Sequence, residues 1–442
     1  MDRDSGERGE RGESGESGQS GESRDSLEAS ARATAGAVVS YRSAFTQPLF
    51  RIYFPSSCLA TLGSWFIRFL FGWLAWELTG SAFFVGSVAC AMLVPTFLLS
   101  PLFGIAADRI DTHSGLLVTT GLQALVSALA GVLALSGLLG ETSVLLLALL
   151  FGAIMSAHTP IRLAFIPRLV VREALPSAVG YSAVAFNSSR ILGPALGAAL
   201  LAVTNVTATF FVGGLASLLA HLLLWRVRVS PLKRDSAQEG DAFFSQLRAG
   251  FAYLKQQRTI RWVFLLTLTS GFLGRTALEL LPALSGTLLA GDASTLATLT
   301  AMAGTGSIVG GLLVSRQASR LQRLYQLVVV SLATAAVLLL TLAQWDSLLL
   351  AGVAIAFLSL CTTIIGTSCQ TLVQLIVSEE LRGRVLSLWT VIAMGTPAIG
   401  ALIFGTAGDY YGLSLVLVIP AIACFGVLGA ATVARVAEEI RD

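Results

Sequence analysis

The chain has 442 residues, of which 55% are hydrophobic and only 12% charged, with a mean hydropathy of +0.77 and a formal net charge of +3. Soluble globular domains carry about 25% charged residues, so this composition excludes a soluble protein and predicts an integral membrane protein. All five cysteines lie inside apolar runs, so the sequence predicts neither a disulfide framework nor a metal cluster.

Residues 1–42 differ from the rest of the chain. They contain a Gly/Glu/Ser repeat, and residues 1–30 hold nine acids and four arginines, a net charge of −5. Such a segment buries too little apolar surface to offset its conformational entropy. We therefore expect a disordered acidic tail, without the apolar stretch of a signal peptide.

Twelve apolar runs follow, each long enough to cross a bilayer as a helix of about 20 residues. The expected spans are 53–79, 83–107, 115–138, 144–167, 178–203, 207–227, 261–289, 294–315, 323–343, 348–376, 385–407 and 412–434. They predict an all-α membrane protein with these parts: an N-terminal six-helix half (43–227), a polar linker with an amphipathic segment (228–260), a C-terminal half (261–435) and a short tail (436–442).

Lysine and arginine alternate between the loops. The turns after the odd-numbered spans carry none, whereas the alternate loops and the linker carry many. Because basic loops stay on the cytoplasmic side, we expect a multi-pass protein of the inner or plasma membrane with both termini in the cytoplasm.

Segment 104–113 is a charged island between two uncharged runs. Three of its positions resemble the signature loop between the second and third helices of the major facilitator superfamily: Gly104, Asp108 and Arg109. Its later positions depart from that pattern, since Asp111, Thr112 and His113 replace a glycine and a basic pair. A polar turn between any two helices is the alternative. The resemblance implies a gating contact between Asp108 and the start of the eleventh span near Arg384.

The two halves resemble copies of each other. Gly104-x-x-x-Asp108-Arg109 is matched 207 positions later by Gly311-x-x-x-Ser315-Arg316, and the fifth-span motif is echoed in the eleventh span 203 positions later. The helix-packing residues of these motifs are Gly193, Pro194, Gly197, Pro397 and Gly400. Glycines allow close helix contact, and proline bends a span. Duplication predicts two pseudo-symmetric six-helix halves, as in the major facilitator fold.

The fifth-span motif also resembles that of antiporters in this superfamily. Residues 159–173 and 185–197 are similar to the branch of macrolide-efflux proteins, enterobactin exporters and lysophospholipid transporters. This resemblance implies proton-driven export of an amphipathic compound, such as a drug or a siderophore.

Polar residues at membrane depth are site candidates, because an unpaired charge there costs several kcal/mol. These are Arg68, Asn187, Arg190, Arg275 and Glu279. The 207-residue offset relates Arg68 to Arg275, which predicts equivalent places facing a central cleft. Arg275 and Glu279 have the i,i+4 spacing of a pair on one helix face. Three arginines against one acid favour an anionic or zwitterionic substrate, and salt bridges that lock the bundle are the alternative.

No nucleotide-binding loop or metal-ligand spacing is present in the sequence. We therefore predict a secondary transporter that is not an enzyme and needs no cofactor or metal. The expected partners are a small molecule, protons and membrane lipid, and we expect a monomer. The positive-inside rule explains the basic linker better than nucleic-acid binding does. Two alternative functions stay open: a lysophospholipid or other lipid transporter, and a transport-inactive membrane sensor.

Overall fold

A computed structural model describes residues 43–229, 254, 257–315, 321–341, 347–377 and 379–439. The predicted acidic tail at 1–42 and almost all of the predicted linker at 228–260 lie outside the described residues. Within the described ranges, the regular structure is entirely helical.

The N-terminal half contains six long helices. They are α2 (Pro48–Thr79), α3 (Ala82–Arg109), α4 (Thr112–Leu135), α5 (Glu141–Phe165), α6 (Leu175–Val203) and α7 (Val206–Trp225). The turns between them contain residues that commonly end or cap helices. Gly80 ends α2 in a left-handed conformation with φ of 60°, and Asn205 caps α7 by accepting a bond from the Ala208 amide at 2.9 Å.

The C-terminal half has the same plan with one interruption. Its helices are α9 (Arg258–Ser270), the π-helical turn η4 (Gly271–Arg275), α10 (Thr276–Glu279), α11 (Leu281–Leu289), α12 (Ala293–Ser315), α13 (Leu321–Leu340), α14 (Leu348–Ile376), α15 (Glu379–Tyr411) and α16 (Leu413–Glu439). Helix α16 extends into the segment predicted as a short tail.

The helices lie where the sequence predicts spans, and most of their ends lie within a few residues of the predicted ones. Ten described helices are long and apolar enough to cross a membrane, and the bent pair Arg258–Glu279 with Leu281–Leu289 adds an eleventh. Helix α3 is also apolar over Ala82–Thr96. The chain is therefore a multi-pass membrane protein, and its helices are consistent with twelve spans.

The prediction of one continuous seventh helix at 261–289 is wrong. The chain bends by 61° after Glu279, where Leu280 leaves the helical conformation (φ −87°, ψ 10°). Pro282 explains the bend, because its ring cannot donate a backbone hydrogen bond and clashes with the preceding turn. The π-helical turn just before the bend is a feature that often marks functional sites.

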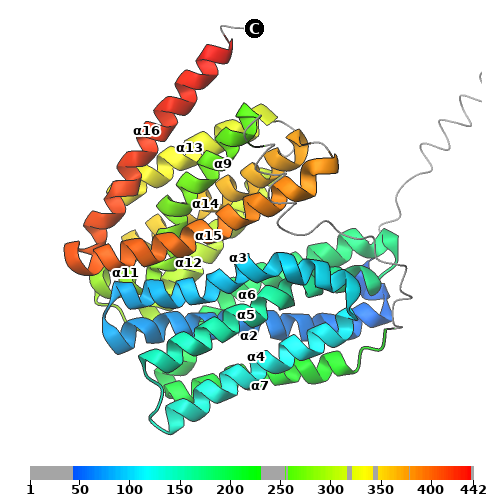
Figure 1. Cartoon of the computed structure of the whole chain (residues 1–442). Helices are drawn as coiled ribbons and strands as arrows, with labels where there is room; N and C mark the ends of the chain where they lie inside the picture. The colour runs from blue at the N-terminus through cyan, green and yellow to red at the C-terminus, as the bar shows by residue number, and fades with distance from the viewer. Residues whose placement is uncertain are drawn as a thin grey trace, which may run out of the picture.

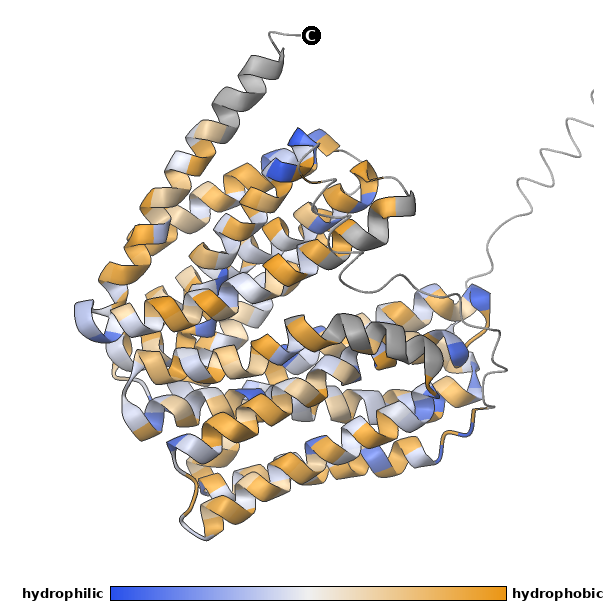
Figure 2. Cartoon of the chain, viewed as in Figure 1, coloured by the Kyte–Doolittle hydropathy of each residue, from blue (hydrophilic) through white to orange (hydrophobic). Residues whose placement is uncertain are grey.

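The two halves lie side by side as separate bundles. In Figure 1, α2 to α7 form the lower bundle and α9 to α16 the upper one, and they meet where α15 lies along α3 and where α12 lies along α6. Hydrophobic residues cover most of the helix surfaces, while hydrophilic residues gather at helix ends and turns (Figure 2). Large exposed side chains such as Val203 (79%) and Leu349 (73%) fit contact with lipid rather than with water.

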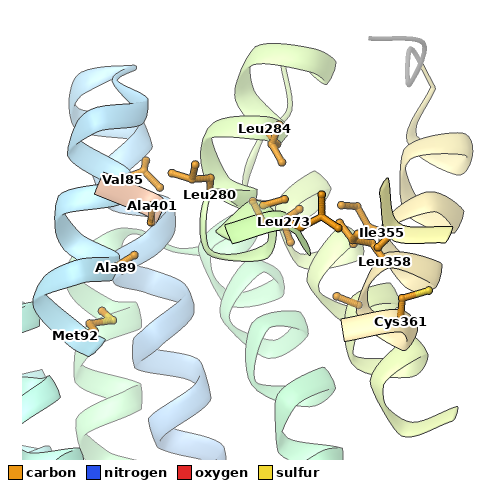
Figure 3. Packing of buried hydrophobic residues seen from close by; sticks show 14 of the residues in the cluster. Val85, Ala89, Met92, Leu273, Leu280, Leu284, Ile355, Leu358, Cys361 and Ala401 are labelled. Carbon is orange, nitrogen blue, oxygen red and sulfur yellow. The ribbon is translucent and has the colours of Figure 1, made fainter. Parts of the chain in front are cut away.

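One hydrophobic cluster crosses the boundary between the halves. Figure 3 shows Val85, Ala89 and Met92 of α3 near Ala401 of α15 and Leu280 of the broken seventh span. The cluster continues to the buried face of α14. The halves are thus joined by a packed apolar interface, and the polar residues described next lie within it.

Candidate functional site: a cavity between the halves

A cavity of about 220 Å³ lies between the two halves. Helices α2, α3 and α6 line it from the N-terminal half, and η4, α10, α11 and α12 line it from the C-terminal half. Four of the five predicted pathway residues line this cavity: Arg68, Arg190, Arg275 and Glu279. The opposite wall is apolar and is formed mainly by α3.

Arg68 and Glu279 form an ion pair across the boundary between the halves. The Arg68 Nη2 atom donates to Glu279 Oε2 at 2.5 Å, and the side chains are 30% and 11% exposed. The expected pairing of Arg275 with Glu279 on one helix is therefore replaced by a contact with α2. An i,i+4 pair contributes only about 0.2–0.5 kcal/mol, so a partner from another helix can displace it.

Arg190 reaches the other half through hydroxyl groups. Its Nη1 donates to Ser307 Oγ of α12 at 2.7 Å, and Thr363 Oγ1 of α14 donates to the same oxygen at 2.9 Å. The ring of Trp65 lies beside both N-half arginines, 5.3 Å from the guanidinium carbon of Arg190 and 6.0 Å from that of Arg68. Such stacking stabilises cations in partly desolvated sites.

Arg275 lines the cavity without a hydrogen-bond or ion-pair partner among the described residues. Among the described lining residues, three arginines against one glutamate give the cavity a formal charge of +2. A charge in a membrane interior is stable only when it is paired or hydrated. By charge alone, this cavity attracts anions more strongly than cations. Asn187 does not line this cavity, and its Nδ2 donates to the Ala183 carbonyl of its own helix at 2.8 Å.

The fifth-span glycines press α6 against α2 beside the arginines. A Cβ added at Gly193 would lie 2.7 Å from the Trp65 Cβ and 2.9 Å from the Phe66 backbone nitrogen, and one at Gly197 would lie 2.8 Å from the Phe69 ring. Pro194 itself lines the cavity. The motif thus fixes the position of the tryptophan that lies beside Arg68 and Arg190.

The matching motif of α15 acts on the seventh span in the same way. A Cβ at Gly400 would clash with Thr276 and contact Phe272, and Thr396 lies against Gly271. Pro397 lies inside α15 between these contacts. Both copies therefore brace the first span of their own half next to its arginine, Arg68 or Arg275, as duplication predicts.

A carboxylate clamp joins the halves at one end of the molecule. Asp409, in the last turn of α15, accepts bonds from Ser81 Oγ at 2.5 Å, the Ala82 amide at 2.7 Å and the Phe83 amide at 3.1 Å. It therefore caps the N-terminus of α3, a helix of the other half. We call these four residues the Asp409 clamp.

Glycines close the same end of the interface. Gly405 of α15 lies against the Ala82 backbone, Gly86 of α3 lies against the Ala401 backbone, and Gly286 of α11 lies against the Trp76 ring of α2. None of the three positions has room for a Cβ without movement. The halves are thus in backbone contact at this end, which the loop charges predict to be the outer one.

The predicted gating contact stays a prediction, because the side chains of Gly104, Asp108, Arg109 and Arg384 lie outside the described residues. The neighbouring Asp111 is described, and it caps α4 by accepting a bond from the Ser114 amide at 3.0 Å. It also pairs with Arg168 Nη1 at 3.2 Å. Partial burial would raise the pKa of this carboxyl, but the bonds from Ser114 and Arg168 outweigh it and lower the pKa below 3.8.

Sequence analysis missed several residues of the site. Trp65 precedes Arg68 by three residues on the same helix face, a spacing that could have indicated it. Ser307 and Thr363 gave no signal, because hydroxyls inside spans usually bond to their own helix. Asp409 falls between the predicted spans 385–407 and 412–434, whereas the structure places it in the last turn of α15.

Comparisons with known proteins agree with this architecture. The staphyloferrin A transporter of Staphylococcus aureus is 25% identical over 393 residues, covering 87% of this chain and 93% of that protein. Macrolide efflux protein A of Streptococcus pyogenes is 26% identical over 349 residues, covering 76% and 84%. Among solved structures, a bacterial homologue of the human lysosomal transporter Spinster, inward-facing and unoccupied, has a TM-score of 0.65 at 15% identity over 87% and 95% of the two chains.

A mutant of the nucleoside transporter NupG has a TM-score of 0.68 at 14% identity, covering 86% of this chain and 98% of that one. These structural similarities show the fold. The model of the family described as transmembrane secretion effector matches residues 39–440, a range that includes every described residue. The chain therefore belongs to the transmembrane secretion effector family of the major facilitator superfamily, whose members are membrane transporters and not enzymes.

Proposed function

We propose that this transporter exports amphipathic, anionic small molecules in exchange for protons. The observation that carries the proposal is the cavity between the halves, where three arginines face a single glutamate. The apolar wall formed by Val85, Val88 and Met92 of α3 suits the hydrophobic part of such a molecule. Relatives named for staphyloferrin A transport and macrolide efflux support a small-molecule substrate.

In this proposal the Arg68–Glu279 pair controls movement of the halves. The pair joins α2 to α10 across the interface, so an empty, unprotonated transporter holds its two halves together. A substrate anion competes with Glu279 for Arg68 and opens the bridge. The glutamate can then pair with Arg275, four residues away on its own helix. The substrate-loaded halves are free to rock.

A proton opens the same bridge by neutralising Glu279, which lets the empty transporter return. The substrate thus opens the ion pair for movement in one direction, and the proton opens it for the return. Exchange transport requires this alternation. Arg190 and Trp65 hold the cation-rich wall in place throughout. In the same proposal, both termini face the cytoplasm, the halves at 43–227 and 261–435 move as units around the cavity, and the transporter acts as a monomer.

The experiment compares Glu279→Gln with Glu77→Gln, an exposed acid on α2 outside the cavity. Each variant is reconstituted in vesicles with an anionic fluorescent amphiphile. We expect Glu279→Gln to abolish export driven by a pH gradient, while it retains binding and exchange of the probe. Glu77→Gln should behave as the wild type. If Glu279→Gln exported normally across the pH range, the proton would have to use another residue and the proposal would fail.

A further inference from the structure

A second cavity lies at the membrane boundary, away from the site between the halves. It has a volume of about 960 Å³ and lies between the start of α4 and the end of α7. His113 and Leu117 line it from α4, and Leu222, Trp225, Arg226 and Arg228 line it from α7 and the residues that follow. We call it the boundary groove.

The boundary groove is held by a contact between its two helices. The His113 ring nitrogen Nε2 donates to the Leu224 carbonyl at the end of α7, with a distance of 3.0 Å. Val227 is fully buried between the two exposed arginines, so it anchors the segment and leaves Arg226 and Arg228 at the surface. The two guanidinium groups are therefore presented together by an anchored backbone.

The groove changes from apolar to cationic along its length. Leu117 and Leu222 lie on the spans, whereas Arg226 and Arg228 follow the last residue of α7. Trp225, which is 71% exposed, lies at the junction, where tryptophan is enriched in membrane proteins. Among the described residues, no carboxylate lines the groove and neither arginine has an ion-pair partner.

We propose that the boundary groove binds an anionic phospholipid. Its phosphate lies between Arg226 and Arg228, the Trp225 ring borders the glycerol region, and an acyl chain follows Leu222 and Leu117 into the membrane. Charge and polarity both match, because basic pockets between membrane helices bind anionic headgroups. A zwitterionic lipid has no net charge to offset the two arginines, so the site selects for negative charge.

The test measures lipid binding to the full-length protein purified in an uncharged detergent. Phosphatidylglycerol and phosphatidylcholine are titrated separately, and bound lipid is counted by native mass spectrometry. The double variant Arg226→Gln/Arg228→Gln is compared with Arg51→Gln/Arg172→Gln. The control removes two exposed arginines that lie outside the groove, at the same predicted side of the membrane.

We expect the groove variant to bind phosphatidylglycerol about 25-fold more weakly, since each of the two basic residues near a membrane surface contributes about fivefold. Its binding of phosphatidylcholine should be unchanged, which also reports an intact fold, and the control should match the wild type. Equal phosphatidylglycerol binding by the groove variant and the wild type would overturn the proposal. An equal loss in the control, or full displacement of the lipid by glycerol phosphate, would overturn it as well.

Discussion

The Asp409 clamp makes a quantitative prediction about the equilibrium between transporter states. Asp409 of one half caps α3 of the other half with three hydrogen bonds, so these bonds exist only while that end is closed. Replacing a capping aspartate by alanine costs about 0.5–2 kcal/mol, and the loss of its charge near a helix N-terminus costs about 0.3–1 kcal/mol. For the exposed Asp409 we expect about 2 kcal/mol in total.

This free energy corresponds to about a 30-fold shift toward the state that is open at that end. Asp409→Asn keeps an oxygen acceptor and loses only the charge, so its shift should be about twofold. The order of the three proteins, with alanine most open, then asparagine, then the wild type, is therefore part of the prediction.

The assay uses Thr300→Cys, a residue of α12 that lines the cavity between the halves, in a background without the five native cysteines. An impermeant maleimide added on the side of Asp409 should label this cysteine faster when the clamp is removed. Asp292→Ala is the control, because Asp292 also caps a helix, through the Thr295 amide at 2.9 Å, but within its own half. Unchanged labelling in Asp409→Ala, or equal acceleration in Asp292→Ala, would refute the clamp.

Two further predictions concern the scaffold. Gly193→Ala should lower the free energy of unfolding by about 1–3 kcal/mol and weaken anion binding, because its Cβ would displace Trp65. Gly180→Ala is the control, because Gly180 lies on the same helix with free space around it. In thermal unfolding this control should be neutral or stabilising. Asp111 has a lowered pKa in the folded protein, so its stabilisation is present above pH 3.8 and is lost as the pH falls below that value. Asp111→Asn should therefore unfold at a lower temperature than the wild type near pH 7, and the difference between the two unfolding temperatures should shrink as the pH falls below 3.8. A constant difference at all pH values would contradict this account.

The sequence predicts the spans well because each of them depends on local composition. The span expected at 348–376 coincides with α14, and the other helix ends lie within a few residues. The broken seventh span shows the limit of this approach. Pro282 lies in the first turn of α11, directly after the break, yet Pro55, Pro194 and Pro397 lie inside unbroken helices. Whether a proline breaks a span depends on neighbouring helices, which the local sequence does not contain.

The sequence indicates which residues belong to the candidate site, but not which of them contact each other. The cost of burying charge identified Arg68, Arg190, Arg275 and Glu279, and all four line one cavity. Their partners depend on how the halves face each other, so the contact of Glu279 with Arg68 could not follow from spacing. The same holds for Arg190 and Ser307, which are 117 residues apart and come from different halves.

The break at Leu280 divides the seventh span into two segments that pack against different helices, and we call them the inner lever and the outer lever. The inner lever, α9 with η4, is held by α14 and α15 of its own half. The outer lever, α11, lies against α12 of its own half and also against α2 of the opposite half, where Gly286 meets Trp76 and Pro282 lies against Gly72. A straight helix would transmit any rotation of the C-terminal half directly to the outer surface. We expect the bend next to Glu279 to let α11 stay against α2 while α9 and η4 turn, so that the cavity changes shape before the halves separate at the Asp409 end.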